Sequence, residues 1–356
     1  MNTTLYSIFS SMPFCLCLFW WVLFMVRRKA VSYPAHRYLS FFAFTCTVLY
    51  FCHAAFFNGE ETPVLRVVYY TCHLSVFPLF WIYIRALTEP ERPKTRDGWV
   101  LLPALVICIV SLVLLACGGS LAWLDLPIRG IFMVQIICVC VSVMRRLTAF
   151  DRQVQNFYVD TEHKSLRSLR GLFFVLIVIS LLSTVGGALG RSIFLRGLVM
   201  IIPSTLFSVL LFCIFHVGLL LEYTAAEMAA GSVEDAHAPA EGDDRVQRAL
   251  LQRIRDLIES QQMYLTPGLK ITDVAEALDT NRTYISASIN RQAGMSFSDY
   301  VNGFRVRHAQ EMMRSKDPDL TLTQIGLRSG FTGDTSFFRN FKKVTGQTPS
   351  EWLSSQ

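Results

Sequence analysis

The residues with the clearest capacity for binding chemistry lie near the C-terminal end of the sequence, in a segment with helical spacing. Phe337 and Phe341 lie four residues apart, and the cationic residues Arg339, Lys342 and Lys343 lie at other helical positions. Residues four apart share one face of a helix, so the two rings define an apolar side and the cations lie elsewhere. A guanidinium group can donate two hydrogen bonds to guanine, and an ammonium group can neutralise a phosphate. The pattern therefore predicts a helix that packs through phenylalanines and offers cations to a nucleic acid.

Neighbouring residues predict that this helix is the second of a pair. Thr321 and Gln324 have the spacing of a capping box, which begins a helix. Gly330 then interrupts the chain before the basic helix, and Thr348 with Pro349 begins a further short helix. Two short helices joined by a turn with glycine, the second carrying cations, are typical of a helix-turn-helix unit.

The same arrangement occurs once more upstream. Thr272 is expected to cap one helix, and Asn281 begins another whose buried side includes Ile285. Gly294 follows that helix, and a single long helix over about 296–313 leads to the second unit. The sequence therefore predicts two helix-turn-helix units on one helical connector.

The stretch from 321 to 352 resembles the C-terminal DNA-binding domain of AraC/XylS-type transcription regulators. The residues that carry the resemblance are Ile325, Gly330, Phe331, Ser336, Phe337, Arg339, Phe341, Lys342, Lys343, Gly346, Thr348, Pro349 and Ser350. The connecting helix resembles the one in that family, with Arg305 and Ala309 at matching positions. The likeness extends over nearly all of 245–356. It implies two reading helices that enter successive major-groove segments, about 34 Å apart.

The resemblance also implies which residues contact DNA. On the first reading helix and its start they are Asn281, Arg282, Thr283, Ser286, Ala287, Asn290 and Arg291. On the second they are Asp334, Thr335, Phe338, Arg339, Lys342 and Lys343. The base-facing positions are Thr283, Ser286, Ala287, Asp334, Thr335, Phe338 and Arg339, and the phosphate-facing ones are Arg282, Asn290, Arg291, Lys342 and Lys343. Because the first helix offers only small side chains to the bases, we expect the second to carry most of the specificity.

Two positions depart from the family pattern. Gly326 stands where alanine is usual, and Ile289 stands where phenylalanine is usual. A glycine inside a helix lowers its stability by about 1 kcal/mol relative to alanine. We therefore expect local flexibility around Gly326.

The remainder of the chain is far more apolar. The protein has 356 residues, 52% of them apolar and 17% charged, with a mean hydropathy of +0.39, which is too apolar for an ordinary soluble protein. Seven apolar runs each approach the roughly 20 residues that a helix needs to cross a bilayer. These runs are about 5–26, 39–57, 67–84, 99–117, 128–144, 171–189 and 197–221. The expected fold is all-α, with a polytopic seven-helix transmembrane bundle (1–221), an acidic linker (222–244) and a soluble all-α domain with two helix-turn-helix units (245–356).

Basic residues between the runs predict the orientation of this bundle. Fourteen Lys and Arg residues lie in the loops after the first, third and fifth runs, and four lie in the alternate loops. Cytoplasmic loops carry the excess of Lys and Arg. The sequence therefore predicts a multi-pass protein of the inner membrane with its N-terminus outside and its C-terminal domain in the cytoplasm, where DNA is found.

The loop over 145–170 is long and has an apolar periodicity. Leu147, Phe150, Val154 and Phe157 recur three and four residues apart. Two structures fit equally well: a helix lying on the membrane surface, and a continuation of the fifth run into the cytoplasm.

Polar residues within the apolar runs are the candidate sensor of an unknown small-molecule or membrane signal. They are His53, His73, Gln135 and His216. Polar side chains inside spans are costly and are often functional. The alternative is that each histidine only bonds a backbone carbonyl of a neighbouring helix.

The motifs leave a regulatory function as the best interpretation. The sequence contains no nucleophile elbow, phosphate-binding loop, zinc-protease or kinase pattern, so we expect no enzyme activity, no cofactor and no metal. The expected partners are double-stranded DNA, the lipid bilayer and the unknown signal. A homodimer is compatible with the sequence, which does not fix the oligomeric state. The alternative functions are a membrane receptor or a transporter whose C-terminal module binds a protein partner.

Overall fold

The computed structural model describes residues 3–27, 34–89, 95–161, 167–189, 198–233, 244–315 and 320–356. These residues are nearly all helical and include no β-strand, which confirms the predicted all-α class. The chain forms two compact units. The first comprises 1–148 and 166–226, and the second comprises 149–165 and 227–356.

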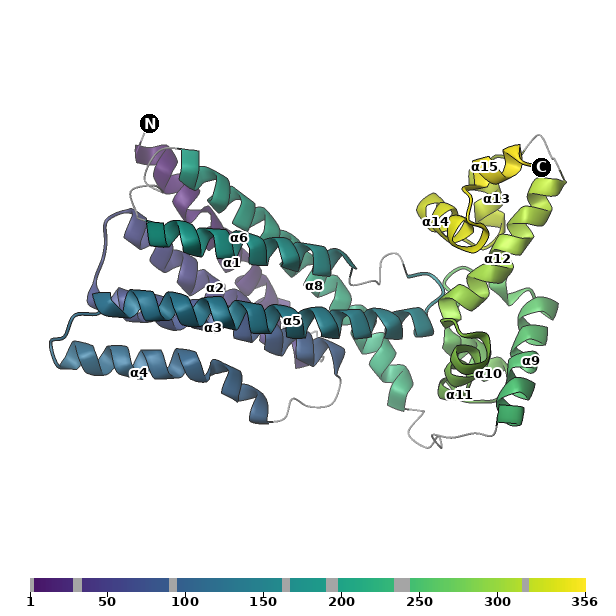
Figure 1. Ribbon diagram of the computed structural model, residues 1–356, viewed down its shortest axis with the longest axis horizontal. Helices are drawn as coiled ribbons and strands as arrows, with labels where there is room; N and C mark the ends of the chain where they lie inside the picture. Colours follow the sequence, from purple (N-terminus) through teal and green to yellow (C-terminus); the bar gives the residue numbers. More distant parts are fainter. Residues whose placement is uncertain are drawn as a thin grey trace. The chain divides into compact units, whose positions relative to one another are not determined.

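Helices make up the described part of the first unit (Figure 1). They are α1 (Thr3–Arg27), α2 (Pro34–Phe57), α3 (Pro63–Thr88), α4 (Leu102–Ala116), α5 (Asp125–Phe157), α6 (Arg167–Leu189) and α8 (Leu198–Val233), with the 3₁₀ turns η1 (Thr95–Leu101) and η2 (Ala122–Leu124). Each of the seven predicted apolar runs therefore coincides with a helix. The final residues of α5 and α8 belong to the second unit.

Six helical segments in the described ranges are long and apolar enough to cross a membrane. They are Ile8–Arg27, Ala35–Phe56, Pro63–Thr88, Asp97–Ala116, Ala122–Phe157 and Ile202–Leu221. The apolar stretch of α6, Leu169–Val185, is shorter. The predicted count of seven spans depends on α6 and stays a prediction.

Helix α3 carries much of the core of the first unit, and α4 carries little. Helix α3 packs against both α2 and α4, and its Tyr83 hydroxyl donates to the backbone carbonyl of Gly218 on α8 at 3.1 Å. A Cβ at Gly218 would lie 2.9 Å from that hydroxyl oxygen, so glycine permits this close approach. By contrast, Leu105 and Ile109 of α4 are more than half exposed. Helix α4 therefore presents an apolar surface to its surroundings, which an aqueous environment would disfavour.

The second unit contains two helix-turn-helix pairs and a connecting helix. Its elements are α9 (Asp244–Ser260), η3 (Met263–Leu265), α10 (Ile271–Ala277), α11 (Arg282–Ser288), the π-helical turn η4 (Ile289–Ala293), α12 (Phe297–Arg314), α13 (Leu322–Arg328), α14 (Asp334–Thr345) and α15 (Pro349–Ser354). The pairs are α10–α11 and α13–α14, and α12 joins them, as predicted.

Helix starts in this unit follow the predicted capping residues with one exception. Thr321 and Thr348 each take part in a capping box, and the side chain of Asn281 accepts from the backbone N–H of Thr283. The predicted cap at Thr272 is wrong. Helix α10 begins at Ile271 with Lys270 at the N-cap, two residues before the predicted cap, and the carboxylate of Asp273 accepts from the backbone N–H of Lys270 at 2.8 Å.

The segment after the fifth apolar run continues as a helix. Helix α5 runs unbroken to Phe157, and the four periodic apolar residues Leu147, Phe150, Val154 and Phe157 are all buried. The structure therefore has the continuation, not the separate surface helix. Helix α8 likewise continues through the first half of the predicted linker to Val233, and residues 234–243 lie outside the described ranges.

Candidate nucleic-acid interface and a cavity in the first unit

Helix α14, the predicted second reading helix, is held by an aromatic core. Phe337 and Phe341 are fully buried in a cluster that includes Ile325, Phe331 and Trp352. The rings of Phe341 and Trp352 meet edge to face, with centroids 5.9 Å apart. Such contacts fix the rotation of the helix about its axis, which decides which side chains face outward.

Gly326 permits the closest contact in this core. A Cβ at this position would lie 2.8 Å from Cγ and 3.1 Å from Cβ of Phe337. Gly326 is buried directly against the Phe337 ring, and the expected local flexibility stays a prediction. Glycine here sets how closely α13 and α14 approach one another.

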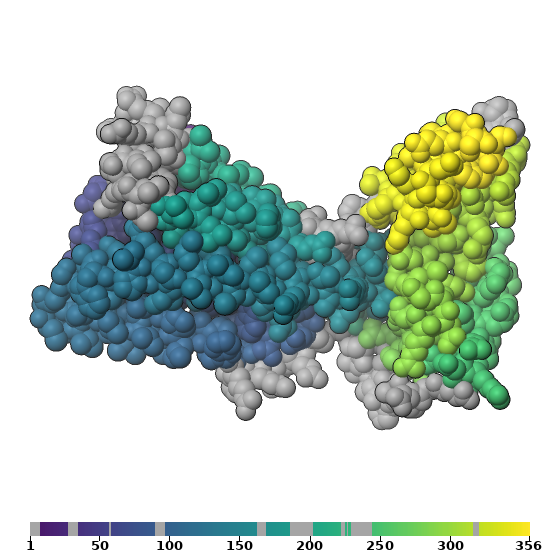
Figure 2. Space-filling view, in the orientation of Figure 1, coloured from purple at the N-terminus to yellow at the C-terminus, as the bar shows by residue number. Residues whose placement is uncertain are grey.

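The outward side of α14 presents most of the predicted DNA-contacting residues. Asp334, Thr335, Arg339, Lys342 and Lys343 are exposed. The C-terminal helices, coloured yellow, lie at the surface in the space-filling view (Figure 2). Asp334 accepts from the Thr323 hydroxyl at 3.1 Å, and Lys343 lies 2.6 Å from the Asp299 carboxylate, so these side chains have partners within the unit.

Phe338 differs from its predicted companions on this helix. It is half-buried and packs against the aromatic core, with its ring edge to face against Phe337 at 5.5 Å. Its predicted contact with a DNA base would have to be made by the exposed part of the ring. That contact stays a prediction.

Helix α11, the predicted first reading helix, is less open than α14. Thr283, Asn290 and Arg291 are exposed, whereas Asn281, Arg282, Ser286 and Ala287 are half-buried. The Asn290 amide donates to the Ser286 hydroxyl at 3.1 Å, and the Asn281 side chain is engaged in capping the helix. Several polar groups predicted to meet DNA are therefore satisfied within the helix itself.

Arg282 makes contacts that the sequence did not predict. Its guanidinium lies over the ring of Phe157, 5.2 Å from the centroid, and donates to the backbone carbonyl of Met228 at 3.3 Å. Phe157 ends α5, and Met228 lies near the end of α8. A residue predicted to contact phosphate is thus held by two segments that are distant in sequence.

The segment Phe157–Asp160 comprises the last residue of α5 and the three residues after it. It packs within the second unit, and we call it the clasp. Tyr158 forms an antiparallel bridge with Lys270, and the backbone N–H of Val159 donates to the Leu269 carbonyl at 3.1 Å. The Tyr158 hydroxyl donates to the Glu227 carboxylate at 2.6 Å. Burial and this hydrogen bond both raise the pKa of Tyr158, so the hydroxyl keeps its proton.

The clasp also supplies the counter-charge for a buried arginine. Arg305 of α12 has no exposed surface, and its guanidinium donates to the Asp160 carboxylate at 2.8 Å. It donates further to the carbonyls of Tyr264 at 2.6 Å and Thr266 at 2.9 Å. Burial lowers the pKa of Arg305, and Asp160 acts against that shift. The family resemblance pointed to Arg305, whereas no sequence signal indicated Asp160.

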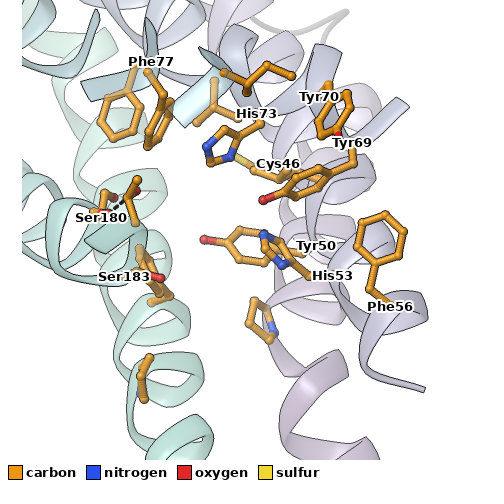
Figure 3. A pocket seen from close by; sticks show the side chains of 18 of the residues that line it. Cys46, Tyr50, His53, Phe56, Tyr69, Tyr70, His73, Phe77, Ser180 and Ser183 are labelled. Atoms are coloured by element: carbon orange, nitrogen blue, oxygen red, sulfur yellow. Dashed lines mark hydrogen bonds between the residues drawn. The ribbon is translucent and has the colours of Figure 1, made fainter. Parts of the chain in front are cut away.

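The first unit encloses a cavity of about 570 Å³ that contains two of the four candidate sensor residues (Figure 3). His53 and His73 line it together with Tyr50 and Tyr69, whose hydroxyls also lie toward the open space in Figure 3. The His53 and Tyr69 rings meet edge to face at 5.1 Å, and Tyr69 stacks on His73 at 5.3 Å. The volume falls within the range of small-molecule sites.

The other two candidates lie outside the residues that line this cavity. His216 stacks on Phe212 at 6.2 Å and meets the Trp20 ring edge to face at 6.5 Å. Both polar side-chain atoms of Gln135 are buried with no hydrogen-bond partner among the described residues. The structure therefore brings His53 and His73 together and leaves His216 and Gln135 apart from them.

Comparisons with known proteins agree with the geometry of the second unit. The family description "Helix-turn-helix domain" matches residues 274–355. An uncharacterized helix-turn-helix transcriptional regulator of Staphylococcus aureus (strain MSSA476) is 25% identical over 28% of this chain and 13% of its own length. The Msm operon regulatory protein of Streptococcus mutans serotype c is 24% identical over 30% of this chain and 36% of its own length.

The chain matches about a third or less of the length of these curated relatives. A solved structure of a protein of unknown function from Listeria innocua is 29% identical and covers 29% of this chain and 96% of its own, with a TM-score of 0.25. A score this low carries no argument. Residues 274–355 nevertheless form an AraC-type helix-turn-helix domain, as found in transcription regulators.

Proposed function

We propose that this protein is a membrane-bound transcription regulator that binds specific double-stranded DNA through two helix-turn-helix units and responds to a signal sensed by its first unit. The observation that carries the proposal is α14, whose aromatic side is buried while Arg339, Lys342 and Lys343 are exposed. A helix held in this way can enter a major groove with its cations outward.

The exposed residues suggest a division of labour on α14. Arg339 is suited to donate to a guanine, which is worth about 1–3 kcal/mol of discrimination. Lys342 and Lys343 are suited to phosphates, which position the protein without reading sequence. On α11, Thr283 is the exposed base-facing candidate, and in the following turn η4, Asn290 and Arg291 are the exposed phosphate candidates.

Membrane location is supported by two independent properties. Six described helical segments are long and apolar enough to span a bilayer, and α4 exposes Leu105, Ile109, Leu112 and Val113. The excess of Lys and Arg after the first, third and fifth runs favours an outside N-terminus and a cytoplasmic second unit. A DNA-binding unit requires that same placement.

The cavity around His53 and His73 supports a sensing role for the first unit. A ligand bound there can act on DNA binding only if its affinity differs between two states of the protein. Neither the cavity nor the second unit calls for a chemical reaction. Transcription regulation without enzyme activity is therefore the function we propose.

DNA binding by the full chain in lipid nanodiscs tests the central claim. Genomic fragments selected on the protein should bind more tightly than scrambled duplexes of equal length. Affinity should fall steeply with salt, by about 10³-fold or more between 50 and 200 mM for six or more phosphate contacts. Equal affinity for selected and scrambled DNA would remove the regulator function and favour a module that binds a protein partner.

Topology is tested separately with reporters fused after Gln356. A reporter active only in the cytoplasm should work, and one active only outside the inner membrane should be silent. The opposite pattern would place the helix-turn-helix units away from DNA and would contradict both the orientation and the function.

A further inference from the structure

The cavity of the first unit is polar at one end and apolar at the other. Helices α3 and α5 both begin at the polar end, where Arg66 and Arg129 line the cavity. Phe77, which also lines it, lies eleven residues after Arg66 on α3, or about 16 Å along the helix axis. The space therefore suits an elongated molecule whose two ends differ in polarity.

The middle of the cavity has an aromatic wall. His73 stacks on Phe132 with ring centroids 3.9 Å apart, and Phe77 meets the same Phe132 ring at 5.7 Å. Across the open space, Figure 3 shows Ser180 and Ser183 on another helix, facing Tyr50 and His53. An apolar body between these surfaces would bury its surface against rings and still meet hydroxyl groups at its edge.

The charges at the polar end are unequally satisfied. Glu61 forms an ion pair with Arg66, and the Tyr70 hydroxyl donates to Asp125. Both carboxylates that line the cavity there are thus engaged by partners within the protein. Arg129 lines the same end, half-buried, and forms no ion pair with any residue that the structure describes. A half-buried guanidinium is stabilised by an anionic partner.

We propose that the cavity binds an amphiphilic organic anion, with its carboxylate or phosphate at Arg129 and its apolar body along His73 and Phe132. This inference names the chemical class of the signal for the proposed regulator. It rests on the proposed function only in treating the bound molecule as a signal. The ligand comes either from solution as a free acid or from the bilayer as an anionic lipid. Both sources share the chemistry that the cavity recognises.

Binding of decanoate and of uncharged decanol, measured by calorimetry, tests the proposal. The full chain is placed in phosphatidylcholine nanodiscs, and no DNA is present. Decanoate should bind at least tenfold more tightly than decanol. Arg129→Gln should abolish that preference while leaving decanol affinity unchanged, and Arg129→Lys should retain most of it. Arg37→Gln, an exposed arginine that does not line the cavity, should behave as the unchanged protein.

The outcomes separate the possible failures. Equal affinity for decanoate and decanol, or a preference that survives Arg129→Gln, overturns the anion site. If phosphatidylglycerol added to the nanodiscs competes with decanoate, the site is supported and its ligand is an anionic lipid. If decanoate binds and phosphatidylglycerol does not compete, the ligand is a free acid. Because no DNA is used, a failure of DNA binding elsewhere leaves this result intact.

The clasp carries a second inference on independent grounds. Phe157 and the Met228 carbonyl together hold the Arg282 guanidinium, which the family resemblance assigns to a phosphate. The ring of Phe157 and the Met228 carbonyl hold the guanidinium in place and occupy one of its five N–H donors, so a move toward a DNA phosphate would have to break these contacts. We infer that the clasp competes with DNA for Arg282, so that its release adds one phosphate contact. This inference also rests on the proposed function.

Salt dependence of DNA binding by the full chain measures that contact directly. Phe157→Ala should steepen the slope of log affinity against log salt by about one unit, because each phosphate contact adds roughly 0.9. Phe157→Leu keeps apolar packing but removes the aromatic face, and it should shift the slope in the same direction. When Arg282→Ala is combined with either variant, the salt slope should not become steeper.

Three results would decide the clasp inference. An unchanged slope in Phe157→Leu overturns it, and so does a gain that persists with Arg282→Ala. If the unchanged protein shows no DNA binding, the proposed function fails first. If it binds DNA and the variants do not differ from it, only the clasp inference fails.

Discussion

The two helix-turn-helix units share a motif and differ in what surrounds their reading helices. Helix α14 rests on a core drawn from α12, α13, α15 and the turn at Phe331, all within residues 306–352. Helix α11 packs against α9, α10 and η4, and its Arg282 also contacts Phe157 and Met228 from far earlier in the chain. The pair α13–α14 draws its core from residues near it in the sequence, whereas the pair α10–α11 also contacts residues far earlier in the chain.

This difference suggests separate tasks for the two units. A reading helix fixed by its own core presents the same side chains whatever the first unit does. A reading helix that shares contacts with the ends of α5 and α8 can change when those helices change. We therefore expect α14 to set sequence preference and α11 to respond to the signal.

The largest expected effect comes from emptying the core of the C-terminal unit. Phe337→Ala should cost about 3–5 kcal/mol, because the fully buried ring leaves a cavity that its neighbours cannot fill. Hydrogen exchange should rise in α13–α15 and stay nearly unchanged in α10–α11. Ile285→Ala, in the core of the other unit, is the matched control. Equal losses in both units would show that they unfold as one body and would break the comparison.

DNA specificity gives the next contrast. Arg339→Ala should lower affinity for the selected operator by about 1–3 kcal/mol while changing affinity for scrambled DNA far less. Thr283→Ala, the exposed base-facing position on α11, should cost less than Arg339→Ala. Competition binding with both duplexes measures each loss. Equal loss on operator and scrambled DNA would make Arg339 a phosphate contact.

Gly326→Ala sets two opposing effects against each other. Alanine gains about 1 kcal/mol of helix propensity, but overpacking against a fixed ring costs about 1–3 kcal/mol. Because Phe337 is fully buried and the close atoms include its Cβ, the ring cannot swing away. We expect a net loss of about 1 kcal/mol in the free energy of unfolding, seen as faster amide hydrogen exchange in α13 and α14. A gain in protection would mean that the two helices separate easily.

The smallest effect should come from a single phosphate contact. Lys342→Ala is expected to weaken binding to operator and scrambled DNA alike and to reduce the salt slope by about one unit. Binding isotherms at three salt concentrations measure the change. A shift in base preference would place Lys342 among the residues that read sequence.

The sequence predicted features that local chemistry controls. Thr321 and Thr348 cap helices as predicted, because their partners lie three residues away. The contact of Gly326 with Phe337 could not be predicted, because helix propensity describes one helix and the ring belongs to the next. The Arg305–Asp160 pair joins residues 145 positions apart, so no spacing rule could indicate it.

The base-facing and phosphate-facing assignments remain predictions for a different reason. They depend on a duplex whose position the protein alone does not fix. The structure does separate Arg339, which is exposed, from Phe338, which is half-buried, and it places His53 and His73 at one cavity. It could not have been foreseen that Arg129, on a different helix, lines that same cavity.

The buried Arg305–Asp160 pair has a consequence for how such a regulator could be deployed. A fragment that began after α8 would lack Asp160, and its Arg305 would be buried without this counter-ion. Losing one partner of a buried pair typically costs about 3–5 kcal/mol. Such a fragment would therefore be less stable than the same helices in the intact chain, so the DNA-binding helices depend on a segment that precedes them by more than 80 residues in the sequence.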